Sequence, residues 1–583
     1  MKKNNAKRIT ALLLTLVMAM TMLAGCGSSS ASSEDATSFE YLLALGNDGA
    51  VYDDLNQNPA IKYWLSKEWD ADGDGEGTQI SVNVIVPPSG SEQDNLNTLL
   101  ATGEYPDIFD MSWCSESLSS LYDNGIILDL TDYIDQYMPN YKAWLAEHPE
   151  YESILTNDGK YICLYAVEDS QREPWCGLLY RRDWLVKYGT NPETGEAFSG
   201  GWTDDTKADW EDDVVFPSGN TDPIYISDWE WMLDIFTKAM EAEGINDGYA
   251  FQLPLRGVEF AGDMNSGFGA AMCDYLDEDG IVRNGQTGDN AKAYLECMRT
   301  WYENGWVNKD FEENVGDMFF STDTESIYSG KVGAWLGYNS QMLDGIASEG
   351  TLTEDSCVFT AATPINDMYG DESVQGKVPT VLYQTDLVTT GIVITDKAKD
   401  KDLASLFTAL DYLYSTEGGL LRQLGLSDEE QAEMQDELYI ENGYTNGAYS
   451  TTVEDDGTEI YHVISDYPDR VPFSATRLVG LTVNRNIDWG YSDTKQHLYD
   501  QWTLYSGTGN ILSVMTDQLT AEEADDLSLW SSMMDTYIDQ EFPKFINGTY
   551  DIDSDADWQD FCAGMEEMDY TKRADMLNSI LGN

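Results

Sequence analysis

The chain has 583 residues, with 32 Lys and Arg against 105 Asp and Glu, and a formal net charge of -73 at pH 7. This length exceeds what one hydrophobic core usually supports, and 42% hydrophobic residues provide for folded cores, so we expect two or more lobes. A surface this acidic repels phosphate backbones and anionic lipid headgroups, which excludes nucleic-acid binding.

The N-terminus has the features of a secretory leader. Its basic region contains Lys2, Lys3, Lys7 and Arg8. The apolar stretch 9–22 is shorter than the ~20 residues that span a bilayer. The sequence LAGC at 23–26 resembles a bacterial lipobox, in which the cysteine thiol receives a diacylglycerol. We expect a signal peptide at 1–25, lipidation of Cys26 and a Ser-rich tether at 26–38. A plain signal peptide that ends near a cysteine is the alternative.

Alternating hydrophobic residues predict a first strand over 79–86 with one buried face. A helix is predicted over 92–101, ended by Gly103, followed by a short strand over 106–109 and a helix over 118–123. Strand, helix and strand in this order predict a parallel sheet in an α/β lobe.

Capping boxes predict two later helix starts, at 227–230 and 520–523. Apolar stripes at helical spacing predict a helix over 289–305 and another from Leu403 to the glycine pair at 418–419. We interpret these stripes as core. Because no long linker follows the tether, the lobes are expected to be joined by short crossings.

No motif for covalent catalysis, nucleotide binding or zinc binding is found along the chain. The fragment Gly330-Lys331 lacks the upstream glycine of a phosphate-binding loop. Paired carboxylates for glycoside hydrolysis stay open, because 105 acidic residues make some pair inevitable and therefore uninformative.

The segment 70–75 (DADGDG) matches the first half of a calcium-binding loop. Asp70, Asp72 and Asp74 would supply oxygens at loop positions 1, 3 and 5. Position 12, where a bidentate Glu closes such a loop, is Ser81. We favour a solvated acidic turn over a calcium site, and we expect no other cofactor.

Several aromatic residues lie beside Gly, Ser or charged residues in expected loops. They include Trp113, Trp175, Trp335, Tyr338 and Trp489. Flat rings in such places are suited to pack on the apolar faces of sugars, and core packing is the alternative for each of them.

From about Phe39 to the C-terminus the chain resembles the extracellular solute-binding lipoproteins of carbohydrate ABC importers, family 1. The motifs that carry the resemblance are TGEYPDIF at 102–109, NGIILDLT at 124–131, DGKY at 158–161, YRRDWL at 180–185, WYENG at 301–305, GKVG at 330–333 and DYLYSTEG at 411–418. Each motif is weak alone, and their order behind a lipobox is the signal.

The resemblance implies an α/β fold of the type II periplasmic-binding-protein class, in which two lobes close on ligand like a hinged trap and the chain crosses several times. The first lobe would take 39–168 and 326–386, and the second 169–325 and 387–583. The segment 190–225 is interpreted as an insertion.

The same resemblance implies ligand contacts in loops at the carboxyl ends of strands that face the cleft. The expected ligand-binding residues are Trp113, Ser115, Arg172, Trp175, Arg256, Glu259, Phe260, Trp335, Tyr338, Arg477 and Trp489.

A protein of this kind is a non-enzymatic receptor that captures an extracellular sugar or oligosaccharide and delivers it to ABC permease subunits. The resemblance implies that the chain is held at the outer face of the bacterial cell membrane by its lipid alone and works as a monomer. The alternatives are a surface glycoside hydrolase or lyase, and an adhesion or scaffold protein, for which repeats are expected. The ligand could also be a peptide or an alginate-like acid. The acidic surface disfavours a polyanion unless Arg172, Arg256 and Arg477 gather locally.

Overall fold

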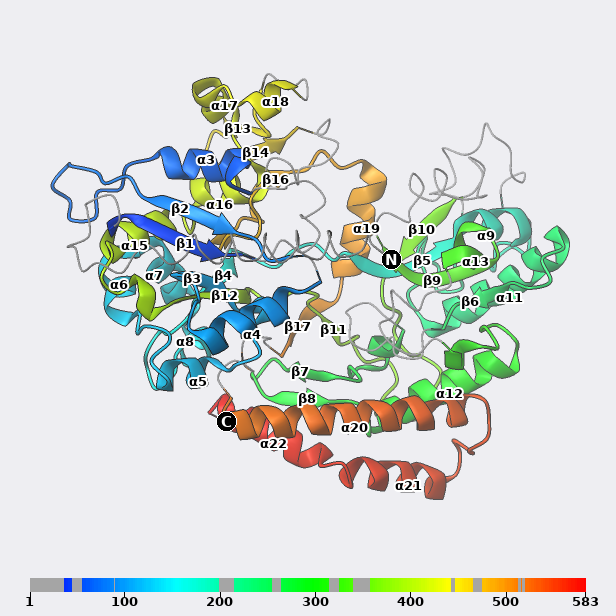
Figure 1. Ribbon diagram of the computed structural model, residues 1–583. Coiled ribbons are helices and arrows are strands. Elements are labelled where there is room, and N and C mark those ends of the chain that lie inside the picture. The colour runs from blue at the N-terminus through cyan, green and yellow to red at the C-terminus, as the bar shows by residue number, and fades with distance from the viewer. Residues whose placement is uncertain are drawn as a thin grey trace, which may run out of the picture.

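The computed structural model (Figure 1) describes residues 36–43, 55–88, 90–198, 214–253, 264–313, 324–338, 357–441, 446–464, 474–511, 515 and 519–582. The leader and Cys26 lie outside the described residues, as do the predicted ligand-binding residues Arg256, Glu259 and Phe260. No helix in the described ranges is long and apolar enough to cross a membrane.

The first lobe is built on a six-stranded sheet in the order β15-β4-β12-β3-β1-β2. Its strands are β1 (Ser38–Leu42), β2 (Ser81–Ile85), β3 (Ile108–Asp110), β4 (Leu164–Glu168), β12 (Val388–Ile394) and β15 (Leu481–Thr482). The parallel pairing of β1 with β2 and with β3 confirms the parallel arrangement predicted from the order of elements. β12 runs antiparallel to both of its neighbours, β3 and β4.

Helices pack around this sheet. They are α3 (Pro59–Ser66), α4 (Glu92–Thr102), α5 (Leu118–Asp123), α6 (Thr131–Tyr137), α7 (Pro139–Glu147), α8 (Glu152–Leu155), α15 (Leu403–Tyr412) and α16 (Thr416–Leu424). The predicted α4 is confirmed and ends where Gly103 adopts φ 73°. The predicted helix end at 418–419 is wrong, because both glycines lie inside α16. A Cβ on Gly418 would lie 2.0 Å from Tyr412 O, so glycine lets α16 follow α15 closely.

The second lobe contains a four-stranded sheet in the order β10-β5-β9-β6. Its strands are β5 (Cys176–Arg181), β6 (Tyr249–Phe251), β9 (Val332–Tyr338) and β10 (Val358–Ala361), and its helices are α9 (Arg182–Tyr188), α11 (Ile226–Glu243), α12 (Asp289–Glu303), α13 (Thr324–Tyr328) and α19 (Asp493–Thr503). The apolar stripe of α12 is buried, as predicted.

The predicted capping box at 227–230 is wrong in position, because α11 begins at Ile226. The carboxylate of Asp228 accepts from the backbone N–H groups of Ile224 and Tyr225, at 2.9 and 3.1 Å. The Ser227 hydroxyl donates instead to Asp367. The capping box of Thr520 and Glu523 is confirmed.

Two smaller sheets complete the described chain. β11 (Val381–Leu382), β17 (Ser506–Asn510), β7 (Asp274–Leu276) and β8 (Val282–Asn284) form one, and β13 (Tyr449–Val453), β14 (Glu459–Val463) and β16 (Ile487–Asp488) form the other, beside α17 (Asp428–Met434) and α18 (Glu437–Glu441). The C-terminal helices are α20 (Ala521–Ile546), α21 (Asp555–Glu566) and α22 (Tyr570–Ile580). Figure 1 shows α20 along the base of the molecule, below β7, β8 and α12.

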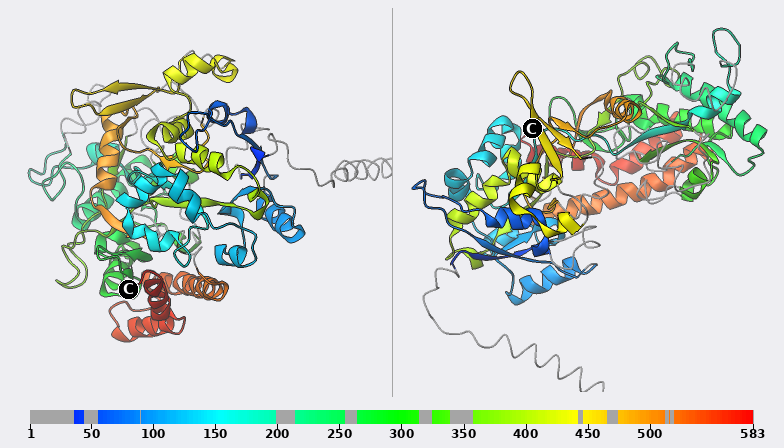
Figure 2. Two further views of the ribbon diagram at one scale, coloured as in Figure 1. Left: turned by 90° about the vertical axis from the view of Figure 1, so that its left-hand side faces the viewer. Right: turned by 90° about the horizontal axis from the view of Figure 1, so that it is seen from above.

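The structure divides the chain between the lobes differently from the prediction. One large cluster of buried apolar residues lies in each lobe, and seen from above the two lobes lie side by side (Figure 2). β9 and β10, within 326–386, pair in the second lobe with β5. β12, within 387–583, pairs in the first lobe. The order of elements in the sequence could not predict this, because β12 comes late in the chain and inserts antiparallel between the earlier strands β3 and β4.

Among the described residues, three short segments run between the parts of the molecule built on different sheets: 169–175 connects β4 with β5, 383–387 connects β11 with β12, and 489–492 connects β16 with α19. These short passages agree with the several crossings that were expected. The carboxyl ends of β3, β4 and β15 lie at one edge of the first sheet, because β15 is parallel to β4 and because β12 runs antiparallel to both β3 and β4. The first crossing leaves the sheet at this edge, since it follows β4.

Candidate functional site

Two adjoining cavities lie at the crossings between the lobes. The larger measures about 440 Å³ and is lined by Gln171, Arg172, Glu173, Pro174, Trp175, Arg422, Gln423, Thr476, Thr482, Asn484, Ile487, Trp489 and Tyr499. The smaller measures about 330 Å³ and is lined by Asp110, Ala166, Arg172, Thr389, Thr390, Gly391, Ile392, Arg422, Thr476, Arg477, Leu478, Val479 and Thr482. Both lie where ligands bind in open α/β sheets, outside the carboxyl ends of strands.

Aromatic rings from both lobes line the larger cavity. Trp489 packs against the core of the first lobe, whereas Trp175 packs against the core of the second. Tyr338 lies beside Trp175, with ring centroids 5.8 Å apart, and Tyr491 stacks on Trp489 at 6.4 Å. Any relative rotation of the lobes therefore changes the spacing between the two indole rings that line the cavity.

The carboxylates at the cavities are held by neighbouring donors. Asp110 at the end of β3 accepts from the backbone N–H and the hydroxyl of Ser112, at 2.7 and 2.6 Å. Burial raises the pKa of Asp110, against the opposing effect of these bonds. Glu173 accepts from the Tyr491 hydroxyl at 2.8 Å, and burial raises its pKa also.

Glu168, the last residue of β4, is 1% exposed and holds two residues of the cavity wall. Its Oε1 lies 2.7 Å from Arg172 Nε, and its Oε2 accepts from Asn484 Nδ2 at 2.9 Å. Burial raises the pKa of Glu168, and Arg172 opposes this shift. The first crossing and the segment that follows β15 are thus tied to one buried carboxyl group.

Arg422 of α16 lines both cavities and anchors the segment 476–482. Its Nη1 donates to the carbonyl oxygens of Thr476 and Leu478 at 2.7 and 3.1 Å, and its Nη2 donates to the Thr482 hydroxyl. The turn requires glycine, because Gly480 has φ +149° and a Cβ there would lie 2.6 Å from Leu413 O. The buried side chain of Arg422 therefore fixes the segment 476–482, which carries Arg477 in the cavity wall.

The structure brings together four of the predicted ligand-binding residues. Arg172, Trp175, Arg477 and Trp489 line one or both cavities. The ring of Tyr338 lies next to that of Trp175, outside the lining. Their contact with ligand stays a prediction. Sequence reasoning missed Arg422, which carries no motif and lies in a helix that otherwise reads as core.

Besides Tyr338, three predicted residues in the described ranges lie outside the lining of both cavities. Trp113, in η3 (Met111–Trp113) just after β3, is 39% exposed. The Ser115 hydroxyl donates to Asn97 Oδ1 at 2.7 Å. Trp335 is corrected to a core residue: it is 0% exposed in the middle of β9, because Trp502 and Leu498 of α19 pack in the same cluster.

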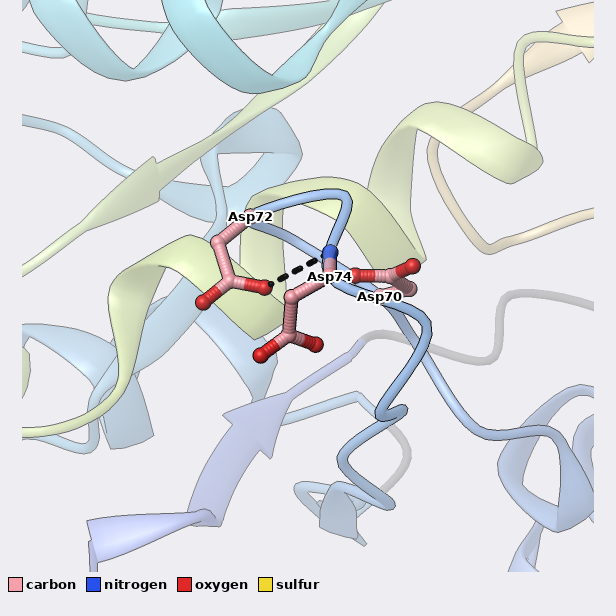
Figure 3. Close-up of side chains that lie close together, drawn as sticks. All are labelled: Asp70, Asp72 and Asp74. Atoms are coloured by element: carbon pink, nitrogen blue, oxygen red, sulfur yellow. Dashed lines mark hydrogen bonds between the residues drawn. The ribbon is translucent and has the colours of Figure 1, made fainter.

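The Asp70 turn is exposed and far along the chain from the cavity-lining residues. One carboxylate oxygen from each of Asp70, Asp72 and Asp74 lies within 4.8 Å of the others. Backbone N–H groups already donate to them: Gly73 and Gly75 to Asp70, and Asp74 to Asp72 at 3.3 Å (Figure 3). Ser81 at the start of β2 supplies no carboxylate at the closing position, so the donor set of a calcium loop is incomplete.

Solved structures of substrate-binding, solute-binding and alginate-binding proteins share this fold. "S.pneumoniae ABC-transporter substrate binding protein FusA in complex with kestose" gives a TM-score of 0.59 at 15% identity, over 94% of this chain and 99% of that one. An extracellular solute-binding protein from Bifidobacterium longum subsp. infantis gives 0.61 at 14% identity, over 95% and 99%. Alginate-binding protein AlgQ2 without calcium ion gives 0.53 at 17% identity, over 94% and 98%.

A sequence relative points the same way. The "Fructooligosaccharide ABC transporter substrate-binding protein FusA" of Streptococcus pneumoniae serotype 4 is 31% identical over 157 residues, which are 22% of this chain and 27% of that protein. The match thus spans about a quarter of the relative. The family described as "Bacterial extracellular solute-binding protein" matches residues 52–420, well over half of the chain. The chain therefore belongs to the family of bacterial extracellular solute-binding proteins.

Proposed function

We propose that this protein is the substrate-binding component of an ABC importer and captures an oligosaccharide between its lobes. The observation that carries the proposal is the larger cavity at the crossings, with Trp175 from one lobe and Trp489 from the other in its wall. Aromatic faces pack on the C–H faces of sugar rings, while arginine, amide and hydroxyl groups bind the hydroxyls. The relative FusA, named for fructooligosaccharide transport, supports this ligand class.

Binding works by a shift between open and closed lobe arrangements. A ligand favours the closed arrangement only by the difference in its affinity for the two states. The two indole rings from opposite lobes supply that difference, because both contact the ligand only when the lobes approach. The importer's membrane subunits would then recognise the closed form, and the chain works as a monomer.

No catalytic step is required by this function. The buried carboxyls Asp110 and Glu168 accept hydrogen bonds from Ser112 and Asn484, so they serve as anchors of the cavity wall. A glycoside hydrolase instead needs one carboxylic acid free to protonate the leaving group. Intact recovery of the bound glycan tests this difference.

We also propose that Cys26 is lipidated and tethers the folded lobes to the outer face of the cell membrane through 26–38. The support is the leader sequence alone. Mass spectrometry of the N-terminal peptide from the native host tests it: a diacylglyceryl adduct on Cys26 is expected, and a cleaved peptide with an unmodified thiol contradicts it.

The decisive test of function is a thermal-shift and calorimetry screen of the purified protein against a glycan panel. A ligand at 100-fold over its Kd adds about 2.7 kcal/mol to the free energy of unfolding. We expect one glycan class to raise the melting temperature and to be recovered uncleaved. Recovery of cleaved product would show that the protein is a hydrolase and not a receptor. Stabilisation by peptides alone would contradict a sugar as the ligand.

A further inference from the structure

Four residues line both cavities and so mark the place where they join: Arg172, Arg422, Thr476 and Thr482. Two of them carry guanidinium groups and two carry hydroxyls, and none carries a carboxylate. The chain as a whole has 32 basic against 105 acidic residues. Two positively charged arginine side chains therefore lie together between the lobes of a protein whose net charge is strongly negative.

Arg422 is a buried cation without a counter-charge in contact. Its side chain is 4% exposed, and its partners are backbone carbonyl oxygens and the Thr482 hydroxyl. Within the described ranges no carboxylate lies within 4.0 Å of its nitrogen atoms. Burial, and after it the charge of Arg172, lower the pKa of Arg422 to about 10. Neutral dipoles solvate this cation, but they do not neutralise it.

Arg172 keeps part of its guanidinium available. Its Nε lies 2.7 Å from Glu168, and its side chain is 46% exposed. Its two Nη groups have no hydrogen-bond or ion-pair partner among the residues that the structure describes. A planar pair of N–H donors matches the two oxygens of a carboxylate.

The carboxylates of the lining lie away from this junction. Asp110 lines only the smaller cavity and Glu173 only the larger. Each already accepts a hydrogen bond, from Ser112 and from Tyr491. Arg477, which lines the smaller cavity, adds a third positive charge on its side of the junction.

We propose that the junction binds a carboxylate of the sugar, so that the ligand is an acidic oligosaccharide that contains a uronic acid or a comparable sugar acid. This inference rests on the proposed function. The Nη groups of Arg172 would hold the carboxylate, Arg422 would stabilise its charge from beneath, and the Thr476 hydroxyl would donate to it. Trp175 and Trp489 would pack on the neighbouring sugar rings.

The test uses matched glycans that differ only in charge. Oligogalacturonates, glucuronate-substituted xylo-oligosaccharides and mannuronate oligomers are each compared with their methyl esters by calorimetry on the full chain. The ester keeps the ring, its linkage and its hydroxyls but removes the negative charge. We expect one free acid to bind roughly tenfold or more tightly than its ester, because charge-assisted bonds are about twice as strong as neutral ones.

Salt dependence and a variant locate the effect. Affinity for the free acid should fall as ionic strength rises, and affinity for the ester should not. Arg172→Gln should remove most of the preference for the free acid over its ester. The control is Arg283→Gln, which removes the same charge from exposed β8, where Arg283 pairs with Asp277. It should keep the full preference.

The outcomes separate this inference from the function beneath it. Equal binding of acids and esters, or tight binding of neutral glycans only, overturns the acidic ligand and leaves the sugar receptor standing. A sulfated sugar that outcompetes every uronate would agree with an anionic ligand but would contradict the proposal that the bound group is a carboxylate. Absence of binding to every glycan would overturn the sugar receptor, and with it this inference.

Discussion

The indole ring of Trp502 packs against Gly177 so closely that a Cβ atom on Gly177 would lie 2.4 Å from it. This contact joins α19 to β5, and Trp502 Nε1 also donates to Leu178 O at 3.3 Å. Because the third crossing with Trp489 directly precedes α19, the position of one cavity wall depends on this close approach.

We therefore expect Gly177→Ala to lower the free energy of unfolding by about 1–3 kcal/mol, the usual cost of overpacking a dense core. Urea denaturation measures it. The matched control is Gly507→Ala in β17, where no atom lies within 4 Å of the added Cβ, and its effect should stay within about 0.5 kcal/mol. Equal effects of the two substitutions would show that α19 moves freely over β5.

Ligand binding should separate the two kinds of tryptophan. Trp489→Ala and Trp175→Ala should each weaken glycan affinity roughly tenfold or more, because each removes a ring from the cavity wall. Trp335→Phe should lower stability and leave the affinity of the folded protein unchanged, since Trp335 is 0% exposed. Calorimetry below the melting temperature checks this, and unchanged affinity in Trp489→Ala would contradict the proposed site.

The sequence predicts the early strands and helices correctly because local sequence patterns determine them. Alternation fixes β2, and Gly103 ends α4 by its left-handed conformation. Trp335 was misread because its neighbours Gly333 and Gly337 suggest a loop, whereas glycines in β9 leave room for closely packed rings: a Cβ on Gly333 would lie 2.4 Å from Phe236. The buried cluster that contains Trp335 includes Leu498 and Trp502 of α19, which lie far later in the chain.

The candidate site was readable only in part for the same reason. Arg172 and Trp175 lie in the first crossing, which the motif order locates. Arg422 and Thr482 reach the cavity because β15 pairs with β4 and because α16 packs below it. Neither contact leaves a trace in the local sequence, since β15 and β4 lie more than 300 residues apart in the chain and α16 and β15 are separate segments.

The stability of the protein should depend on pH through His497. Hydrogen bonding to Asp222, whose Oδ1 lies 3.4 Å from His497 Nε2, raises the pKa of this imidazole in the folded state. Its contribution to stability is fully present below the unfolded pKa near 6.5 and is lost as pH rises through the higher folded value. We expect the free energy of unfolding to fall between about pH 6 and pH 8 more steeply in the wild type than in His497→Gln.

Denaturation at several pH values in constant ionic strength measures this slope. An identical slope in His497→Gln would show that the contact with Asp222 does not persist in solution.

Calcium should bind the Asp70 turn weakly, and one substitution should strengthen it. Three carboxylate oxygens already lie within 4.8 Å of one another, but Ser81 leaves the loop without its closing bidentate ligand. We expect a Kd in the millimolar range or weaker for the wild type, at the upper limit for extracellular calcium modules. Ser81→Glu should lower the Kd at least tenfold in calorimetric titration with Ca²⁺. Asn83→Glu places the same charge on the same exposed face of β2 but outside the loop, so it should leave the Kd near the wild-type value. If both variants tighten binding alike, the effect is only that of added negative charge, and the turn does not fold around the ion as a calcium loop does.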